Sequence, residues 1–193
     1  MKTAIVEPST KRDLAEPLKV DSLAPYFSGI DQYGEFQSLD RLQSKGPFAI
    51  IFYRGHWCYF CRRHIIQFQK GLDQLTDEGF PVILVTPEKP QYISETLEKT
   101  NVKFPILHDN LNYIMNNYKV SRSVSKTTRA PFTKVDLTKV NGAIDPVLPV
   151  PATYIVGTDG IIKYAHFNLN YALRSSFKTV AKTVKEIRAT ARH

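Results

Sequence analysis

Residues 48–61 read Phe48-Ala-Ile-Ile-Phe-Tyr-Arg-Gly-His-Trp-Cys58-Tyr-Phe-Cys61, an apolar run that leads into the only two cysteines of the chain. The β-branched and aromatic residues predict a buried strand, and the residues after Cys58 have helical periodicity. The two cysteines therefore fall where a strand turns into a helix. Open α/β sheets place their chemistry at such points.

The segment after Cys58 predicts an amphipathic helix that ends near Gly79. Cys61 lies on its apolar stripe and is expected to be buried, whereas Cys58 lies at the N-terminal end of the helix. Unpaired backbone N–H groups there, and the nearby Arg54, stabilise a thiolate. We therefore predict that Cys58 has the lower thiol pKa and attacks, and that Cys61 resolves the bond formed. The stripe comprises Cys61, Ile65, Phe68, Leu72 and Leu75.

The length and cysteine content indicate one domain of an intracellular type. A chain of 193 residues can bury its own core, and two cysteines cannot make the disulfide framework of a small secreted protein. The first residues do not read as a signal peptide, and no apolar run is long enough for a membrane span. We therefore expect a cytoplasmic protein without a membrane partner, in which a Cys-x-x-Cys pair is catalytic or metal-binding.

The formal net charge of +8 raises the hypothesis of nucleic-acid binding, since Lys and Arg clusters release phosphate counterions. Part of the excess lies on the last predicted helix, opposite its apolar stripe, and this part forms first of all a solvated face. The distribution argues against a nucleic-acid partner, and the charge can instead steer acidic proteins toward the chain. The basic residues concerned are Arg122, Lys126, Arg129, Lys134 and Lys139, and then Lys178, Lys182, Lys185 and Arg188.

The order of predicted elements indicates an α/β protein. Residues 1–20 are expected to form an N-terminal arm, and residues 21–193 a single domain with a long loop or insertion at about 121–150. Strands are predicted at 48–53, 82–86, 104–107, 148–156 and 161–167, with hairpins around Gly34 and at Asp159-Gly160. Helices are predicted at 91–99, 110–118 and 175–188. The alternation favours three layers, with helices on both faces of a mixed central sheet.

Four runs of this sequence resemble the thioredoxin fold and, within it, the alkyl hydroperoxide reductase and thiol-specific antioxidant superfamily of peroxiredoxin-like redoxins. They are residues 24–27, 52–61, 104–109 and 149–156. The resemblance implies a redox-active centre in an antioxidant oxidoreductase of cell redox homeostasis, without a cofactor, served by a thiol reductant such as a thioredoxin or glutathione system. It also implies that Pro151 is a cis-proline that faces the cysteines, since only X-Pro bonds reach cis cheaply.

The sequence departs from typical peroxiredoxins at several positions. Counted back from Cys58, the proline and the Thr or Ser of the family pattern fall on Ile51 and Gly55, so the hydroxyl that orients a peroxide is missing. The family's arginine is also absent where Pro151 stands, although Arg54 can supply charge from another direction. The residues between the cysteines help to set the reduction potential, which leaves the direction of electron flow open.

Two redox functions follow from these residues. In the leading interpretation the chain is a thiol-disulfide oxidoreductase, in which Cys58 attacks a substrate disulfide and Cys61 releases the product. In the alternative it is a thiol peroxidase, in which peroxide oxidises Cys58 to a sulfenic acid and Cys61 condenses with it. Substrate, electron donor and oligomeric state stay open.

A third hypothesis is a zinc site. His56, Cys58, Cys61 and His64 offer two imidazoles and two thiolates within nine positions. Zinc sites with this cysteine spacing normally draw their second ligand pair from a distant segment. We therefore expect no metal here, and expect His56 to tune the thiols.

The aromatic residues beside the cysteines predict a docking surface. Trp57, Tyr59 and Phe60 crowd the start of the helix, whose apolar stripe is already occupied. We expect Tyr59 and Phe60 to bind substrate and, with a cis Pro151, to accept an extended polypeptide. The alternative is that these aromatic residues pack under residues 121–150.

Overall fold

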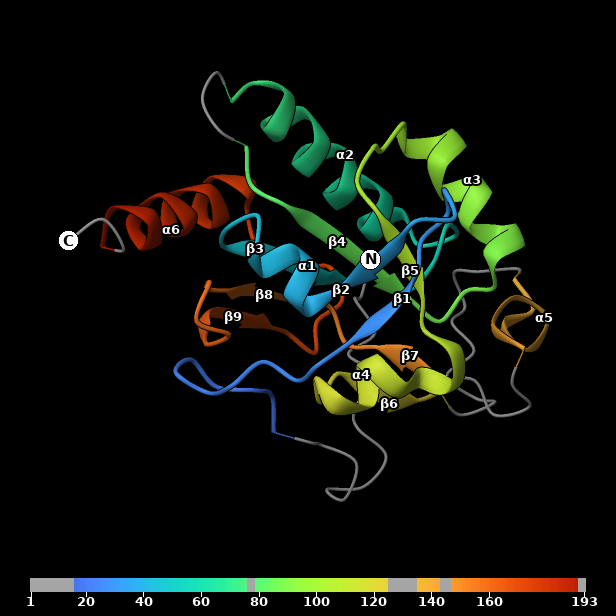
Figure 1. Cartoon of the computed structure of the whole chain (residues 1–193). Coiled ribbons are helices and arrows are strands. Elements are labelled where there is room, and N and C mark those ends of the chain that lie inside the picture. Colours follow the sequence, from blue (N-terminus) through green and yellow to red (C-terminus); the bar gives the residue numbers. More distant parts are fainter. Residues whose placement is uncertain (1–15, 76–78, 125–134, 143–146, 191–193) are drawn as a thin grey trace.

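The computed structural model describes residues 16–75, 79–124, 135–142 and 147–190 (Figure 1). Its centre is a mixed five-stranded sheet in the order β5 (Ile106–His108), β4 (Val82–Thr86), β3 (Phe48–Phe52), β8 (Ala152–Val156) and β9 (Ile162–Phe167). Strands β3, β4 and β5 are parallel, whereas β8 is antiparallel to both β3 and β9. Every residue of β3, β4 and β8 is buried, as expected of strands covered on both faces.

Helices cover both faces of this sheet (Figure 1). The helices α2 (Tyr59–Asp73), α3 (Pro90–Thr100) and α6 (Phe177–Thr190) pack on one face, and α1 (Leu39–Gln43) and α4 (Tyr113–Asn117) pack on the other. Alternate residues of β3 supply the two cores, with Phe52 in one and Ile51 in the other. The predicted three-layer α/β architecture is confirmed.

Two predicted helices differ from the observed ones. Helix α2 ends at Asp73, and the capping N–H of Gln74 donates to Gly71, so the helix stops before the expected Gly79. The helix predicted at 110–118 is divided into a 3-10 turn (Asn110–Asn112) and α4. The Asp109 carboxylate accepts hydrogen bonds from the first N–H groups of α4, which fixes the start of that helix.

Short elements lie within the range 121–150. Strand β6 (Ser121–Ser123) pairs antiparallel with β7 (Val147–Pro149), and α5 (Leu137–Asn141) lies between them in the chain. The strand predicted at 148–156 is therefore two strands in two different sheets. The hairpin of β1 (Ser28–Ile30) and β2 (Phe36–Ser38) has the predicted place around Gly34. Most of the predicted arm, residues 1–15, and residues 125–134 lie outside the described residues.

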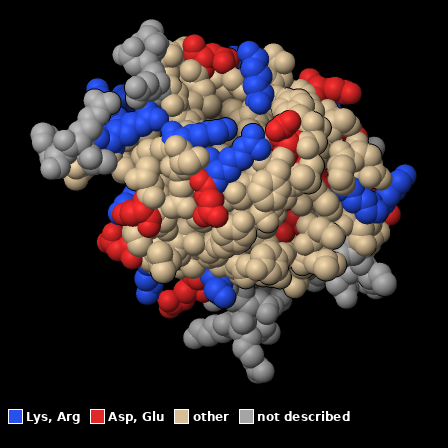
Figure 2. Space-filling model, in the orientation of Figure 1, with Lys and Arg blue, Asp and Glu red and all other residues tan. Residues whose placement is uncertain are grey.

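The surface carries interspersed charges. Figure 2 shows Lys and Arg side chains mixed with Asp and Glu on this face, with a basic group on the side where Figure 1 places α6. Val180 and Val184 of α6 are buried, so its lysines lie on the solvated face as predicted. Among the residues that the structure describes, no helix has the length and apolarity needed to cross a bilayer.

Candidate active site

The loop between β3 and α2 brings the two cysteines to the carboxyl edge of the sheet. Cys58 is the N-cap residue of α2, with an extended backbone, and its N–H donates to the Gly55 carbonyl at 3.0 Å. Cys61 lies in the first turn of the helix and packs into the core below it. These positions agree with the sequence prediction. The exposure differs from it, because both side chains are buried, at 4% for Cys58 and 1% for Cys61.

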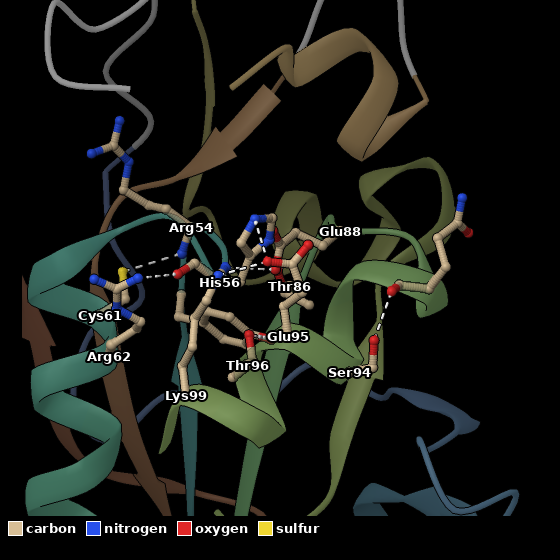
Figure 3. Close-up of polar contacts among 12 residues, drawn as sticks. Arg54, His56, Cys61, Arg62, Thr86, Glu88, Ser94, Glu95, Thr96 and Lys99 are labelled. Carbon is tan, nitrogen blue, oxygen red and sulfur yellow. Dashed lines mark hydrogen bonds and ion pairs between the residues drawn. The ribbon is translucent and has the colours of Figure 1, made fainter. Parts of the chain in front are cut away.

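Three donors converge on the sulfur of Cys61. The backbone N–H of Arg54 lies 3.4 Å from its Sγ atom (Figure 3), and the guanidinium of Arg174 lies at the same distance. The thiol of Cys58 supplies the third hydrogen bond, and the two cysteines are free rather than joined in a disulfide. Such donors stabilise the charged form of a thiol.

One proton of the two thiols is lost readily, and the donors around Cys61 favour the negative charge on that sulfur. Burial alone would raise the pKa of Cys61, but the hydrogen bond from Cys58, the charge of Arg174 and the Arg54 N–H outweigh it and lower that pKa to about 5. The pKa of Cys58 is raised, first by its hydrogen bond to Cys61 and then by burial, although Arg54 opposes this rise. Interacting thiols of this kind titrate as a pair.

This order reverses the one predicted from the sequence. The prediction assumed that the helix N-terminus and the charge of Arg54 stabilise the thiolate of Cys58. In the structure the stronger donors point at Cys61 instead, and one of them is a guanidinium from a distant segment. The donors around Cys61 thus run against the prediction that Cys58 has the lower thiol pKa.

Arg174 is held in place by its neighbour in the connection between β9 and α6. The Ser175 hydroxyl donates to Thr153 Oγ1 at 2.8 Å, and the Ser175 carbonyl lies 2.9 Å from the Nε2 atom of His64. Both partners of Ser175 are buried, Thr153 on β8 and His64 on α2. They hold the connection against the helix that carries Cys61, so that the guanidinium reaches the sulfur.

Arg54 lies between two aromatic rings. Its Cζ atom is 5.0 Å from the ring centroids of both Trp57 and Tyr171, a cation–π arrangement on each side. Phe60 contacts the same Tyr171 ring edge to face. The predicted supporting residues Arg54 and Trp57 thus lie beside the dithiol. The predicted pair Tyr59 and Phe60 lies at the surface, with 59% and 36% of each side chain exposed.

A buried carboxylate fixes the loop before Cys58 (Figure 3). Glu88, two residues after β4, accepts hydrogen bonds from the His56 backbone N–H at 2.9 Å and from its ring Nδ1 atom at 2.6 Å. Burial raises the pKa of Glu88, and the contacts with His56 oppose that rise. The His56 ring also stacks on Tyr92 and lies 3.5 Å from the Glu95 carboxylate. His56 therefore belongs to a carboxylate network beside the thiols.

Pro151 lies in the core immediately before β8, which begins beside the end of β3. No cis peptide bond occurs among the described residues, so the bond before Pro151 is trans and the cis expectation is wrong. The N–H of Val150 donates to the Val120 carbonyl at 2.7 Å, because the small β6–β7 sheet holds this part of the chain. That N–H is not free to pair with a bound strand.

The described part of the chain contains no ligand set for the hypothetical zinc site. No group of three or more His, Cys, Asp or Glu side chains there has the geometry to hold a metal ion. The two histidines considered from the sequence face other partners, His56 on Glu88 and His64 on Ser175.

Comparison with known families decides the relationship. The model of the AhpC/TSA family matches residues 20–165. The chain belongs to the AhpC/TSA family. Among curated AhpC/TSA relatives, the chain is similar to Peroxiredoxin Bcp of Escherichia coli K12, with 28% identity over 104 residues. That match covers 54% of this chain and 66% of the relative, slightly less than two thirds of its length.

Solved structures place the AhpC/TSA chain in the thioredoxin-like fold. Peroxidoxin BcpB from Mycobacterium tuberculosis has a TM-score of 0.66 at 17% identity, over 89% of this chain and 97% of that one. The thioredoxin domain of a thiol-disulfide oxidoreductase from Bacteroides vulgatus has a TM-score of 0.58 at 18% identity, over 86% and 99% of the two chains. The family and the fold implied by the sequence resemblance are thus confirmed.

Three residues of this AhpC/TSA site were missed by reasoning from sequence. Glu88 had a signal, because it lies two residues after a predicted strand, at the same sheet edge as the cysteines. Tyr171 and Arg174 had none, since they come from a connection without periodicity that lies more than a hundred residues from Cys61.

Proposed function

We propose that this chain is a thiol-dependent peroxidase that works through Cys58 and Cys61. The observation that carries the proposal is a thiolate sulfur that accepts several hydrogen bonds and is almost completely buried. A small peroxide needs only a minor fluctuation to reach a sulfur that is 1% exposed, whereas a folded protein's disulfide needs a larger opening. Membership of the AhpC/TSA family and the match to a peroxiredoxin support the same activity.

The first step is attack by the Cys61 thiolate on one oxygen of the peroxide. The O–O bond breaks, that oxygen becomes the sulfenic acid of Cys61, and the other leaves as water or an alcohol after it takes up a proton. Arg174 and the Arg54 N–H hold the negative charge before the attack. The guanidinium of Arg54, between Trp57 and Tyr171, adds positive potential at the neighbouring Cys58.

The second step joins the two cysteines. Cys58 attacks the Cys61 sulfenic acid, water leaves, and an internal disulfide forms. A thiol reductant, such as a thioredoxin or glutathione system of the cytoplasm, then returns two electrons and two protons. Both cysteines keep the catalytic part assigned from sequence, with their order exchanged. His56 and Glu88 hold the loop that carries Cys58.

The test compares single cysteine variants under hydrogen peroxide with a small dithiol as reductant. Cys61→Ser should abolish turnover, and Cys58→Ser should form one equivalent of sulfenic acid on Cys61, detectable by dimedone trapping and mass spectrometry. Sulfenic acid on Cys58 in Cys61→Ser at the wild-type rate would overturn the order of attack. Absence of peroxide consumption by the wild-type chain would overturn the function.

Thiol-disulfide exchange is a second candidate, and two observations favour it. The Cys-x-x-Cys spacing across a helix N-terminus suits exchange, and the exposed Tyr59 and Phe60 offer a contact surface beside Cys58. Reduction of a protein disulfide, measured against peroxide consumption by the same preparation, separates the two activities. Faster protein disulfide reduction, with mixed disulfides trapped in Cys61→Ser, would favour this candidate.

A further inference from the structure

A basic pocket lies between α2 and α3, at the surface beside the dithiol. Its volume is about 430 Å³, within the range of ligand pockets. Its α2 residues follow one another at helical spacing, so they form one exposed face that extends about 16 Å along the helix. The lining residues are Tyr59, Arg62, Arg63, Ile66, Gln67, Lys70 and Lys99.

The charge of this pocket is largely uncompensated. Four of its lining residues are cationic and none is acidic. Lys99 forms an ion pair with Glu95 at 2.6 Å, which compensates one charge. Arg62 donates to the backbone carbonyl of His56 at 3.1 Å, a neutral acceptor that leaves its charge in place (Figure 3). No ion pair involves Arg63 or Lys70 within the part of the chain that the structure describes.

The pocket begins at the redox centre. Tyr59 lines it and directly follows Cys58 in the chain, as the first residue of α2. A molecule seated along α2 therefore has one end at Tyr59, the residue that follows Cys58. Ile66 and the exposed Tyr59 ring add apolar contact area between the cationic side chains.

We propose that this pocket binds an acidic segment of the thiol-bearing protein that reduces the Cys58–Cys61 disulfide. The occupant is a polypeptide segment because the charges on α2 are distributed over about two turns of helix, from Arg62 to Lys70, and a single small anion would meet only one or two of them. Carboxylates spaced along such a segment match these cations. Charge complementarity of this kind sets the encounter rate and the choice of partner.

The inference rests on the proposed function, since it names the reductant of the same disulfide. In the step concerned, a thiolate of the reductant attacks the internal disulfide and a mixed disulfide forms. The second thiol of the reductant then attacks that mixed disulfide. The reductant ends as a disulfide, and Cys58 and Cys61 regain two electrons and two protons.

The experiment measures peroxide turnover with synthetic dithiol peptides as the reductant. One Cys-Gly-Pro-Cys peptide is flanked by glutamates and another by lysines, and dithiothreitol is the neutral reference. The glutamate peptide should have a KM about tenfold below that of the lysine peptide at low salt, and added salt should diminish the difference. In the double variant Arg63→Glu/Lys70→Glu this preference should disappear or reverse.

A matched variant controls for net charge. Lys178→Glu/Lys182→Glu makes the same change of charge on α6, away from the pocket, and should keep the preference for the acidic peptide. Equal KM values for the two peptides would overturn the proposed role of the pocket, and so would an equal loss of preference in both double variants. In either case, turnover with dithiothreitol would still uphold the proposed function. No turnover with any reductant would overturn the proposed function itself.

Discussion

The guanidinium of Arg174 lies 3.4 Å from the sulfur of Cys61, although 113 residues separate the two in the sequence. Because this cation stabilises the thiolate, Arg174→Met should raise the first pKa of the dithiol by about one unit or more. The measurement is a titration of thiolate ultraviolet absorbance in the reduced protein. Arg62→Met is the control, since Arg62 donates to a carbonyl and not to sulfur. Identical titrations of the Arg174 variant and the wild type would contradict the assignment.

The loop before Cys58 depends on a glycine. Gly55 has φ +149°, and a Cβ atom there would come within 2.5 Å of both the Glu88 carboxylate and the Trp57 ring. Gly55→Ala should therefore lower the free energy of unfolding by about 2 kcal/mol or more and reduce peroxide turnover.

Gly34→Ala gives the matched control for that prediction. Gly34 also has a positive φ, +82°, but no atom lies within 4 Å of a Cβ placed there. Gly34→Ala should lower the free energy of unfolding by about 1 kcal/mol, through backbone strain alone, and should retain turnover. Urea unfolding of both variants measures the difference. An equal loss of unfolding free energy in the two variants would mean that the contacts of residue 55 with Glu88 and Trp57 are not tight in solution.

The buried His64 should make stability depend on pH. Burial, and after it the charge of Arg174, lowers the pKa of His64 to about 4. The unfolded chain takes up this proton near pH 6.5, so the free energy of unfolding should fall as the pH drops from about 6.5 to about 4. The loss attributable to His64 approaches roughly 3 kcal/mol at the acid end.

His64→Gln isolates this contribution. The amide can still donate to the Ser175 carbonyl but takes up no proton in this range. The difference in unfolding free energy between wild type and variant, measured with urea across the window, should therefore change with pH. A difference that stays constant from pH 7 to pH 4 would show that the imidazole is not buried in its neutral form.

Tyr59 should contribute to partner contact more than to stability. Its side chain is 59% exposed, and Tyr59→Ala should change the free energy of unfolding by less than about 1 kcal/mol. Turnover with a dithiol peptide should fall further than turnover with dithiothreitol. Tyr113→Ala is the control, because Tyr113 is 62% exposed and begins α4 on the opposite face of the sheet. Equal effects of the two variants on peptide turnover would contradict a contact role for Tyr59.

The central strands were predictable because their residues are apolar on both faces. The run 82–86 is a strand with the predicted bounds, and the run before Cys58 ends within one residue of its prediction. Local periodicity carries this information without tertiary contacts. Periodicity failed at 110–118, where one helix was predicted, because Leu111 has a left-handed backbone and is 85% exposed. There the Asp109 carboxylate accepts hydrogen bonds from the N–H groups of Ile114 and Met115, which holds the start of α4.

The electrostatics of the site could not be predicted in the same way. The position of Cys58 at the helix N-cap followed from the sequence, and the burial of Cys61 followed from its place on the stripe. Which sulfur carries the charge depends on Arg174, and its reach depends on the anchoring of Ser175 to two other elements. Such long-range contacts leave no periodic pattern in the chain.

The stacking of Arg54 on Trp57 gives the protein an internal optical reporter. Trp57 is the only tryptophan of the chain, and it directly precedes Cys58. Indole emission responds to the polarity and the charges around the ring, and here the stacked Arg54 also donates its backbone N–H to the Cys61 sulfur. The intrinsic fluorescence of the unlabelled protein therefore offers a direct, continuous readout of oxidation and re-reduction at the dithiol.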